Sequence, residues 1–226
     1  MAEATAPSSR SRVRRHPERA RYEAQLVEAI LDESMICHLG FIADGVPYVV
    51  PTMYARAGNQ VYIHGSPASR MLQSASGAVD VCLTVTLLDG LVMARSAFHH
   101  SMNYRSVMIL GSAREVLDPA EKLTAFERLV EHVCRGRWGE VRQPSDKELN
   151  STKVLALGLQ EASVKLRSGG PNVPEADQGV SVWAGEIPLR TVALPPSGED
   201  QPNSPAGSHI MSYTRPGWTA PPQPGG

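Results

Sequence analysis

The sequence has no excess of charge of either sign, because its 22 Lys and Arg residues nearly balance its 23 Asp and Glu residues. Proteins that coat nucleic acid electrostatically are usually strongly basic, so near-neutrality excludes that class. The sequence also has no uninterrupted run of about 18 apolar residues, which excludes a membrane-spanning helix. Its N-terminus is basic but lacks an apolar segment behind the basic residues, so no secretory signal is expected.

Cysteine is scarce as well. Cys37, Cys82 and Cys134 are the 3 cysteines of the chain, and none belongs to a C-x-x-C pair. An odd number at wide spacing argues against a disulfide framework and against a structural zinc site. The sequence also lacks G-x-S-x-G and any motif typical of a nucleophilic cysteine. These absences predict a reduced, cytoplasmic protein and give no sign of covalent catalysis.

Composition divides the chain into three parts. Residues 1–16 form a basic leader, since six arginines fall within residues 10–21. This leader is either a flexible, solvated lead-in to the first helix or an anion-binding arm. Residues 195–226 hold 8 of the 18 prolines and few apolar residues, so they are predicted to be a disordered tail that cannot offset its ordering entropy. The remaining residues, 17–194, have the size of one domain.

Short β-branched or aromatic runs separated by turn residues indicate antiparallel strands in this domain. The runs at 35–42 and 46–55 flank Asp44-Gly45, which is a strong hairpin signal. Asp89-Gly90 marks a second hairpin, and Gly111 indicates a bulge or bend within a long strand. Further strands are predicted at 60–64, 79–87, 91–97, 104–116 and 152–167.

Helices are few. Apolar stripes at helical spacing predict helices at 17–33 and 119–134, a short helix at 67–76, and one further turn at 144–150. The total of six or seven antiparallel strands joined by hairpins favours a mainly β (α+β) fold. We expect a small β-barrel with peripheral helices, because alternating βαβ units are absent.

The junction after the third predicted strand has the composition of a phosphate site. The strand ends at His64-Gly65, and the following helix carries Ser69 and Arg70 in its first turn. Free backbone N–H groups, a hydroxyl and a guanidinium would then converge on one point, as phosphate binding requires. The alternative is an ordinary strand–helix junction with an exposed arginine.

Two other stretches are rich in polar or aromatic side chains. The stretch 95–106 contains His99 and His100, but adjacent histidines on a strand point to opposite faces, so no metal site is expected. The stretch 181–188 contains Trp183 followed by Ala and Gly. It could either cover a planar ligand or plug the end of the barrel.

Four stretches together resemble a known family, in the order YIHGSPASRM, VTLLDGLVMARSAFHHSMNYRSV, GSAREVLDPAEK and VWAGEIPL. They are similar to the pyridoxamine 5′-phosphate oxidase-like flavoproteins, and most similar to the nitroimidazole-reductase-like branch. The resemblance covers about residues 13–190. It implies a split β-barrel that binds FMN at the interface of a homodimer.

The resemblance also implies which residues contact the cofactor. In such families an Arg-Lys pair at the start of the helix after strand three holds the FMN phosphate; Arg70 matches the arginine, but Met71 stands where lysine is common. The implied site comprises Pro51, Thr52 and Met53 along the isoalloxazine ring, Ile63 and His64 beside the flavin, Ser69 and Arg70 at the phosphate, Arg105 and Ser106 near the dimer interface, and Trp183 from the partner chain.

The family's Arg-x-His signature for pyridoxal phosphate is absent after Pro188, so pyridoxamine-phosphate oxidase activity is not expected. The leading hypothesis is an FMN-dependent oxidoreductase that passes electrons from a reduced nicotinamide to a small planar acceptor such as a nitroaromatic or quinone. One alternative is a non-catalytic flavin or haem module that binds or senses; another is a reductase that uses the deazaflavin F420. The absorption spectrum of the purified protein distinguishes flavin from haem.

Overall fold

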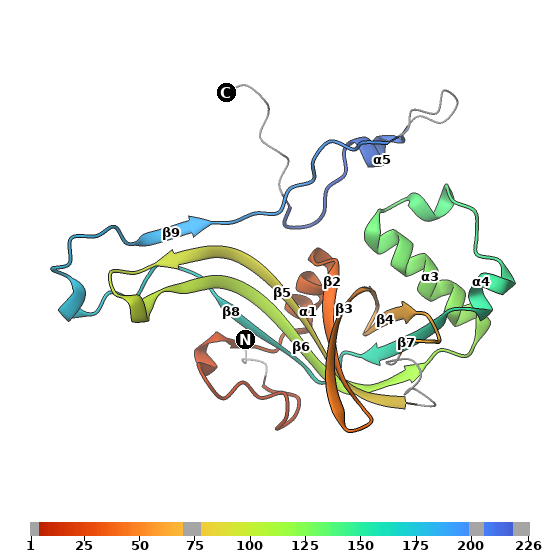
Figure 1. Cartoon of the computed structure of the whole chain (residues 1–226), viewed down its shortest axis with the longest axis horizontal. Coiled ribbons are helices and arrows are strands. Elements are labelled where there is room, and N and C mark those ends of the chain that lie inside the picture. The colour runs from red at the N-terminus through yellow and green to blue at the C-terminus, as the bar shows by residue number, and fades with distance from the viewer. Residues whose placement is uncertain (1–4, 70–77, 199–205, 219–226) are drawn as a thin grey trace.

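The computed structural model describes residues 5–69, 78–198 and 206–218 (Figure 1). The strands are β1 (Ala20–Arg21), β2 (Ile36–Ala43), β3 (Val46–Ala57), β4 (Gln60–Gly65), β5 (Ala78–Met93), β6 (Ser101–Glu115), β7 (Lys153–Gly158), β8 (Ala162–Arg167) and β9 (Gly185–Pro188). The helices are α1 (Ala24–Glu33), α3 (Pro119–Val133), α4 (Asp146–Asn150) and α5 (Ser208–Met211). Short 3-10 turns occupy Pro17–Arg19, Ala97–His99, Arg137–Gly139 and Glu175–Asp177.

The strands form one antiparallel sheet of nine strands in the order β1-β8-β6-β7-β4-β3-β2-β5-β9. An additional pairing of β6 with β5 closes the six strands from β6 through β5 into a ring. The closed ring confirms the barrel expected from the sequence, while β1, β8 and β9 extend the sheet outside it. Long β5 and β6 continue together beyond the ring as an arm, along which β9 lies (Figure 1).

The core lies inside the ring because the strands alternate apolar and polar residues with period two. On β5 the side chains of Val79, Val81, Leu83 and Val85 are buried, and the residues between them are more exposed. Helix α1 packs its apolar stripe into the same core cluster. Burial of each such Ile or Leu side chain stabilises the folded state by about 1.5–3 kcal/mol.

Helix α3 packs on the outside of the ring. Its N-cap Asp118 accepts hydrogen bonds from the backbone N–H groups of Ala120 and Glu121, which satisfies two of the donors that a helix start leaves free. Ala125 and Phe126 then pack on a second, smaller apolar cluster formed with Tyr62 and neighbouring side chains. This helix therefore covers the outer face of β4 and β7.

Three local predictions are wrong. The first helix begins at Ala24 rather than at Pro17, because residues 20–21 pair with β8 as a strand. Asp89-Gly90 does not form a hairpin, since β5 continues through it with a shift in register between Leu88 and Gly90. The residues predicted as one strand at 152–167 form the two strands β7 and β8, which pair with different parts of the sheet.

Gly111 does not mark a bulge either, since β5 and β6 stay in register there. A Cβ atom at this position would lie 2.9 Å from the Leu157 side chain, so glycine permits a close approach of β6 and β7. The predicted helix at 67–76 lies outside the described residues from Arg70 onward. Within the part that the structure describes, no helix is long and apolar enough to cross a membrane.

Part of the segment predicted to be a disordered tail is folded onto the domain. Residues 206–218 include α5 and place the buried Arg215 against the ends of α1 and α3. The expectation of disorder counted only apolar side chains, whereas this segment is held by hydrogen bonds from one guanidinium to backbone carbonyls.

Candidate functional site

Two of the predicted site residues meet at a small pocket on the outer face of the ring. On β4 the side chains of Val61 and Ile63 point into the core, so His64 points outward, toward α3. Met53 of β3 lines the same pocket, which has a volume of about 230 Å³. Its other lining residues come from α3 and the turn that follows: Phe126, Leu129, Val130, Val133, Cys134 and Arg137.

His64 is the polar residue of this pocket that is best placed to bind a ligand. Its Nδ1 atom is buried and has no hydrogen-bond partner among the described residues. Its ring lies 6.2 Å from the ring of Phe126, measured between centroids. Burial lowers the pKa of His64, so the imidazole is neutral at physiological pH. A neutral imidazole nitrogen can ligate a transition-metal ion or form a hydrogen bond with a cofactor.

Ser69 adds a second buried polar atom. Its Oγ has no partner in the described part of the chain. A turn before it is held by the hydrogen bonds from Ser69 N to Ser66 O at 2.9 Å and from Ala68 N to Ser66 Oγ at 3.2 Å. The predicted phosphate ligand Arg70 and its neighbour Met71 lie outside the described residues.

The other predicted site residues on β3 and β4 do not line this pocket. Pro51 is exposed on β3, opposite His38 of β2. Thr52 is half-buried and Ile63 is fully buried in the core, so the Ile63 side chain faces away from the pocket. Ile63 could therefore border a ligand in this pocket only through its backbone.

Arg105 is not near this pocket but between two carboxylates. It donates to Asp89 at 2.9 and 2.7 Å and to Glu33 at 2.5 and 2.9 Å. These hydrogen bonds raise the pKa of Arg105 and engage most of its donors. Its neighbour Ser106 donates a hydrogen bond to the carbonyl oxygen of Lys165 at 3.1 Å.

The last two candidate groups also lie away from the pocket at His64. The Trp183 side chain is 65% exposed and folds back over Gly185, where a Cβ atom would lie 2.6 Å from its ring. His99 is paired with Ser96 Oγ at 2.7 Å and lies 3.6 Å from Asp177. No group of three or more metal-ligating side chains is found among the described residues.

Sequence reasoning missed the part of the pocket contributed by α3. The apolar stripe at 119–134 predicts a helix, but helical spacing alone does not show that most of this stripe lines a pocket. It also missed the segment 206–218, which forms one side of a second cavity described below. The only signal for that segment is a lone arginine in a Pro/Gly-rich stretch.

The closed six-strand antiparallel ring with few helices defines a protein of the split-barrel class. Residues 23–166 match the pyridoxamine 5′-phosphate oxidase family, and the chain belongs to this family. This result confirms the resemblance identified from the sequence.

Solved structures include two similar over most of the chain. The flavocytochrome Anf3 from Azotobacter vinelandii has 40% identity and a TM-score of 0.87, covering 94% of this chain and 100% of that one. An FAD and heme binding protein from Mycobacterium smegmatis has 29% identity and a TM-score of 0.81, covering 87% of this chain and 98% of that one.

A third structure shows the fold alone. It is a candidate 5-nitroimidazole antibiotic resistance protein from Bacteroides thetaiotaomicron, with 23% identity, a TM-score of 0.54 and coverage of 65% of this chain and 85% of that one. No curated protein matches the sequence significantly.

Proposed function

We propose that this protein is a redox protein that binds both a flavin and a haem. The observation that carries the proposal is the 40% identity to a flavocytochrome across 94% of the chain. A second similar structure, at 29% identity, is that of a protein that binds FAD and heme. These similarities support the flavin- and haem-binding hypothesis more than a reductase acting on a nitroaromatic or quinone.

The pocket at His64 presents groups of the kinds that bind a haem iron and a porphyrin edge. His64 offers a buried, neutral ring nitrogen without a partner in the described chain, which is the group that haem proteins use on iron. Phe126, Leu129 and Val130 offer apolar contacts beside it, as a porphyrin requires. We assign His64 as an iron ligand and the α3 side chains as the wall that excludes water from it.

The flavin is assigned to the neighbouring surface. Pro51 is exposed on the outer face of β3, and Ser69 presents a buried hydroxyl without a partner among the described residues. The Ser69 hydroxyl would donate a hydrogen bond to the flavin phosphate, beside the predicted ligand Arg70. The relatives favour FAD over the FMN expected from the sequence.

Together the two cofactors would join a two-electron donor to one-electron chemistry, because a flavin accepts a hydride and a haem iron exchanges single electrons. In this proposal the donor is a reduced nicotinamide. The anionic cofactor F420 would need free cations, and it is not supported because three described arginines are engaged: Arg56 with Asp32, Arg95 with the Gln178 carbonyl and Arg105 with Glu33. All three cysteines are free, and we propose a cytoplasmic location on that basis.

The test is the absorption spectrum of the full chain purified without added ligand, combined with mass spectrometry of the released cofactors. The expected result is flavin bands together with a Soret band. A protein with flavin but no haem would favour the FMN-dependent reductase instead. A protein with neither chromophore would contradict both hypotheses.

The His64 assignment needs its own variant. His64→Ala is expected to abolish or shift the Soret band while flavin remains bound. The matched control is His16→Asn, because His16 is exposed in the leader with a φ of 57°, which asparagine tolerates. An unchanged Soret band in His64→Ala would show that another residue ligates the iron.

A further inference from the structure

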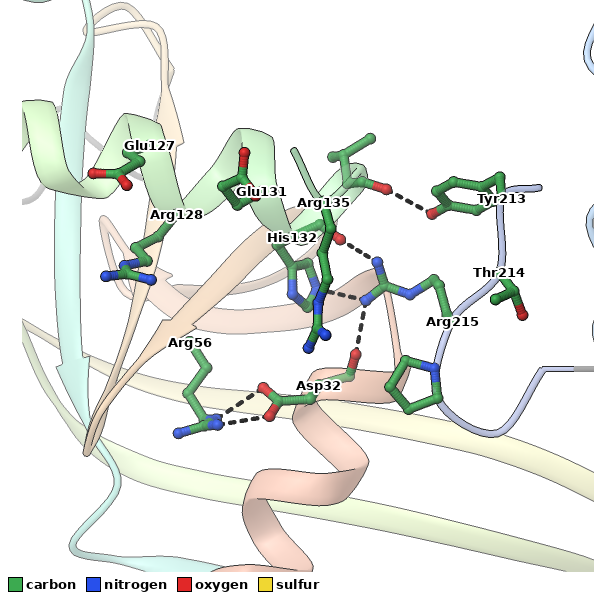
Figure 2. A pocket seen from close by; sticks show the side chains of 12 residues that line it. Asp32, Arg56, Glu127, Arg128, Glu131, His132, Arg135, Tyr213, Thr214 and Arg215 are labelled. Carbon is green, nitrogen blue, oxygen red and sulfur yellow. Dashed lines mark hydrogen bonds and ion pairs between the residues drawn. The ribbon is translucent and has the colours of Figure 1, made fainter. Parts of the chain in front are cut away.

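A second cavity, of about 460 Å³, lies between α1, α3 and the segment 206–218 (Figure 2). Asp32 comes from the end of α1, Arg56 from β3, and Arg128 and Arg135 from α3 and the residues after it. The side facing them is formed by Tyr213, Thr214, Arg215 and Pro216. The cavity is polar and has the size of a site for a small metabolite.

One cation in this cavity is held rigidly. Arg56 binds Asp32 with both ends of its guanidinium, at 2.8 and 2.6 Å, and donates to the Gly58 carbonyl at 3.0 Å. Its side chain is only 19% exposed, and Glu28 lies 3.7 Å away. Asp32 therefore orients Arg56 and does not leave it free to turn away from the cavity.

Two further cations have no protein partner. Within the described chain, no hydrogen bond or ion pair engages Arg128 or Arg135, although both line the cavity. Figure 2 shows their guanidinium groups below α3, on the side where Arg56 lies. Both side chains are exposed, and unpaired guanidinium groups of this kind bind oxyanions through charge-assisted hydrogen bonds.

The acidic residues of the lining do not cancel these cations. The carboxylate oxygens of Glu131 accept hydrogen bonds from the backbone N–H groups of Gly136 at 2.8 Å and Trp138 at 2.9 Å. In Figure 2 the carboxylates of Glu127 and Glu131 lie at the level of the α3 ribbon, whereas the three guanidinium groups lie below it. Asp32 is matched by Arg56, which leaves Arg128 and Arg135 for a ligand.

Most polar side chains on the opposite side of the cavity already form intramolecular hydrogen bonds. The Tyr213 hydroxyl donates to the Val133 carbonyl at 2.6 Å, and Arg215 donates to backbone carbonyls at the ends of both helices. Burial lowers the pKa of His132 to about 4, so this imidazole adds no charge to the cavity at physiological pH. Thr214 also lines this side, and its hydroxyl forms no intramolecular hydrogen bond within the described residues.

We propose that this cavity binds a small phosphorylated metabolite, with its phosphate held by Arg128 and Arg135 and oriented by Arg56. The site differs from the pocket at His64, and its occupation does not depend on flavin or haem. Because Tyr213 and Thr214 form one side of it, a bound phosphate would also hold the segment 206–218 in place.

The test is calorimetric titration of the purified full chain with inorganic pyrophosphate at physiological ionic strength. We expect saturable binding to one site per chain. The double variant Arg128→Ala/Arg135→Ala should weaken binding by at least about tenfold, because it removes the charge-assisted hydrogen bonds from both guanidinium groups to the phosphate. The control Arg142→Ala/Arg190→Ala removes the same charge from exposed sites outside the cavity and should bind normally.

A second readout follows the segment itself. Pyrophosphate should slow the proteolytic cleavage of residues 206–218 in the parent chain and not in the double variant. Citrate, a multivalent anion that contains no phosphate, is the control ligand. No saturable binding, equal binding of citrate, or equal weakening in the control variant would each overturn the proposal. Since neither readout uses the cofactor spectrum, failure here leaves the flavin and haem proposal intact.

Discussion

At the scale of single residues, Arg105 shows how a group with a functional signature can be structural. The resemblance places it among the cofactor-site residues near the dimer interface, yet its donors go to Glu33 and Asp89. Glu33 is buried, and Arg105 is its ion-pair partner. A buried carboxylate without a partner is costly, so Arg105 stabilises the fold through Glu33.

Arg105→Gln is therefore expected to lower the free energy of unfolding by about 2–4 kcal/mol, less than the full cost of a buried unpaired charge because the site is partly exposed to solvent. Urea denaturation followed by circular dichroism measures the change. The control is Arg142→Gln, which breaks the exposed pair with Glu148 and should leave the midpoint unchanged. Equal midpoints for the two variants would mean that Glu33 finds another partner.

His132 predicts a pH dependence of stability. Its Nε2 donates to the Ser34 carbonyl at 2.8 Å, and its ring lies 5.1 Å from that of Tyr54. Burial, and then the charge of Arg215, lower its pKa from 6.5 to about 4. The unfolded chain therefore binds a proton at a higher pH than the folded chain does.

The stabilisation from His132 is complete above its unfolded pKa of 6.5 and is lost as the pH falls toward its folded pKa of about 4. The loss should reach about 3 kcal/mol over that interval. Urea titrations at several pH values measure it. His132→Gln should flatten this slope, leaving the smaller contribution of His64, whose pKa is lowered in the same direction. If the free energy of unfolding depended on pH just as steeply in the variant, another residue would cause the effect.

At the scale of elements, Arg215 joins the ends of two helices. The last carbonyl groups of a helix have no partner within it. Arg215 donates to the carbonyls of Asp32, Glu33 and Ser34 at the end of α1 and to that of His132 at the end of α3. One planar guanidinium thus satisfies orphan acceptors from two elements, which a lysine ammonium could not do with the same geometry.

Arg215→Ala is expected to release the segment 206–218 while the barrel stays folded. Limited proteolysis should then cut this segment several times faster, with the barrel fragment remaining intact. The cleavage rate of Arg215→Lys should lie between those of the parent chain and Arg215→Ala, because lysine keeps the charge but lacks the planar set of guanidinium donors. Met211→Ala, a change at an exposed side chain of α5, is the control and should not accelerate cleavage.

Local signals predict the elements that are themselves local. At the β2–β3 turn, Asp44 and Gly45 both adopt positive φ, at 51° and 75°, as a tight hairpin requires. The same dipeptide at Asp89-Gly90 forms no hairpin, because Gly90 pairs with Asn103 on one side and with Pro188 on the other. Two flanking strands, distant in sequence, override the dipeptide, and no local pattern records them.

The candidate site divides in the same way. The resemblance points to Met53 and His64, and the structure brings both to one pocket. The α3 wall could not be predicted, because core and pocket positions on a helix share one spacing. The role of Arg215 could not be predicted either, since its acceptors are backbone carbonyls far away in the sequence, such as that of Glu33, 182 residues before it.

At the scale of the whole molecule, the outer face of β2 and β3 is unusually apolar. Ile42 is 65% exposed and Val49 is 68% exposed, and Ile36 is exposed on the same face of β2. A contiguous apolar surface on a monomer marks an interaction site. We propose that this surface is the homodimer interface expected from the resemblance, with the cofactors beside it at Pro51.

Val49→Glu is expected to convert the dimer to a monomer, because it places a charge at the centre of an apolar contact. Sedimentation velocity measures the oligomeric state, and absorbance in the same cell reports the bound cofactor. Leu117→Glu is the matched control, since Leu117 is 79% exposed in the loop before α3 and lies away from this face. If the second subunit completes the cofactor site, monomer formation and loss of the chromophore should occur together in Val49→Glu. A parent chain that sediments as a monomer with its cofactors bound would contradict the proposal, because one subunit would then be sufficient.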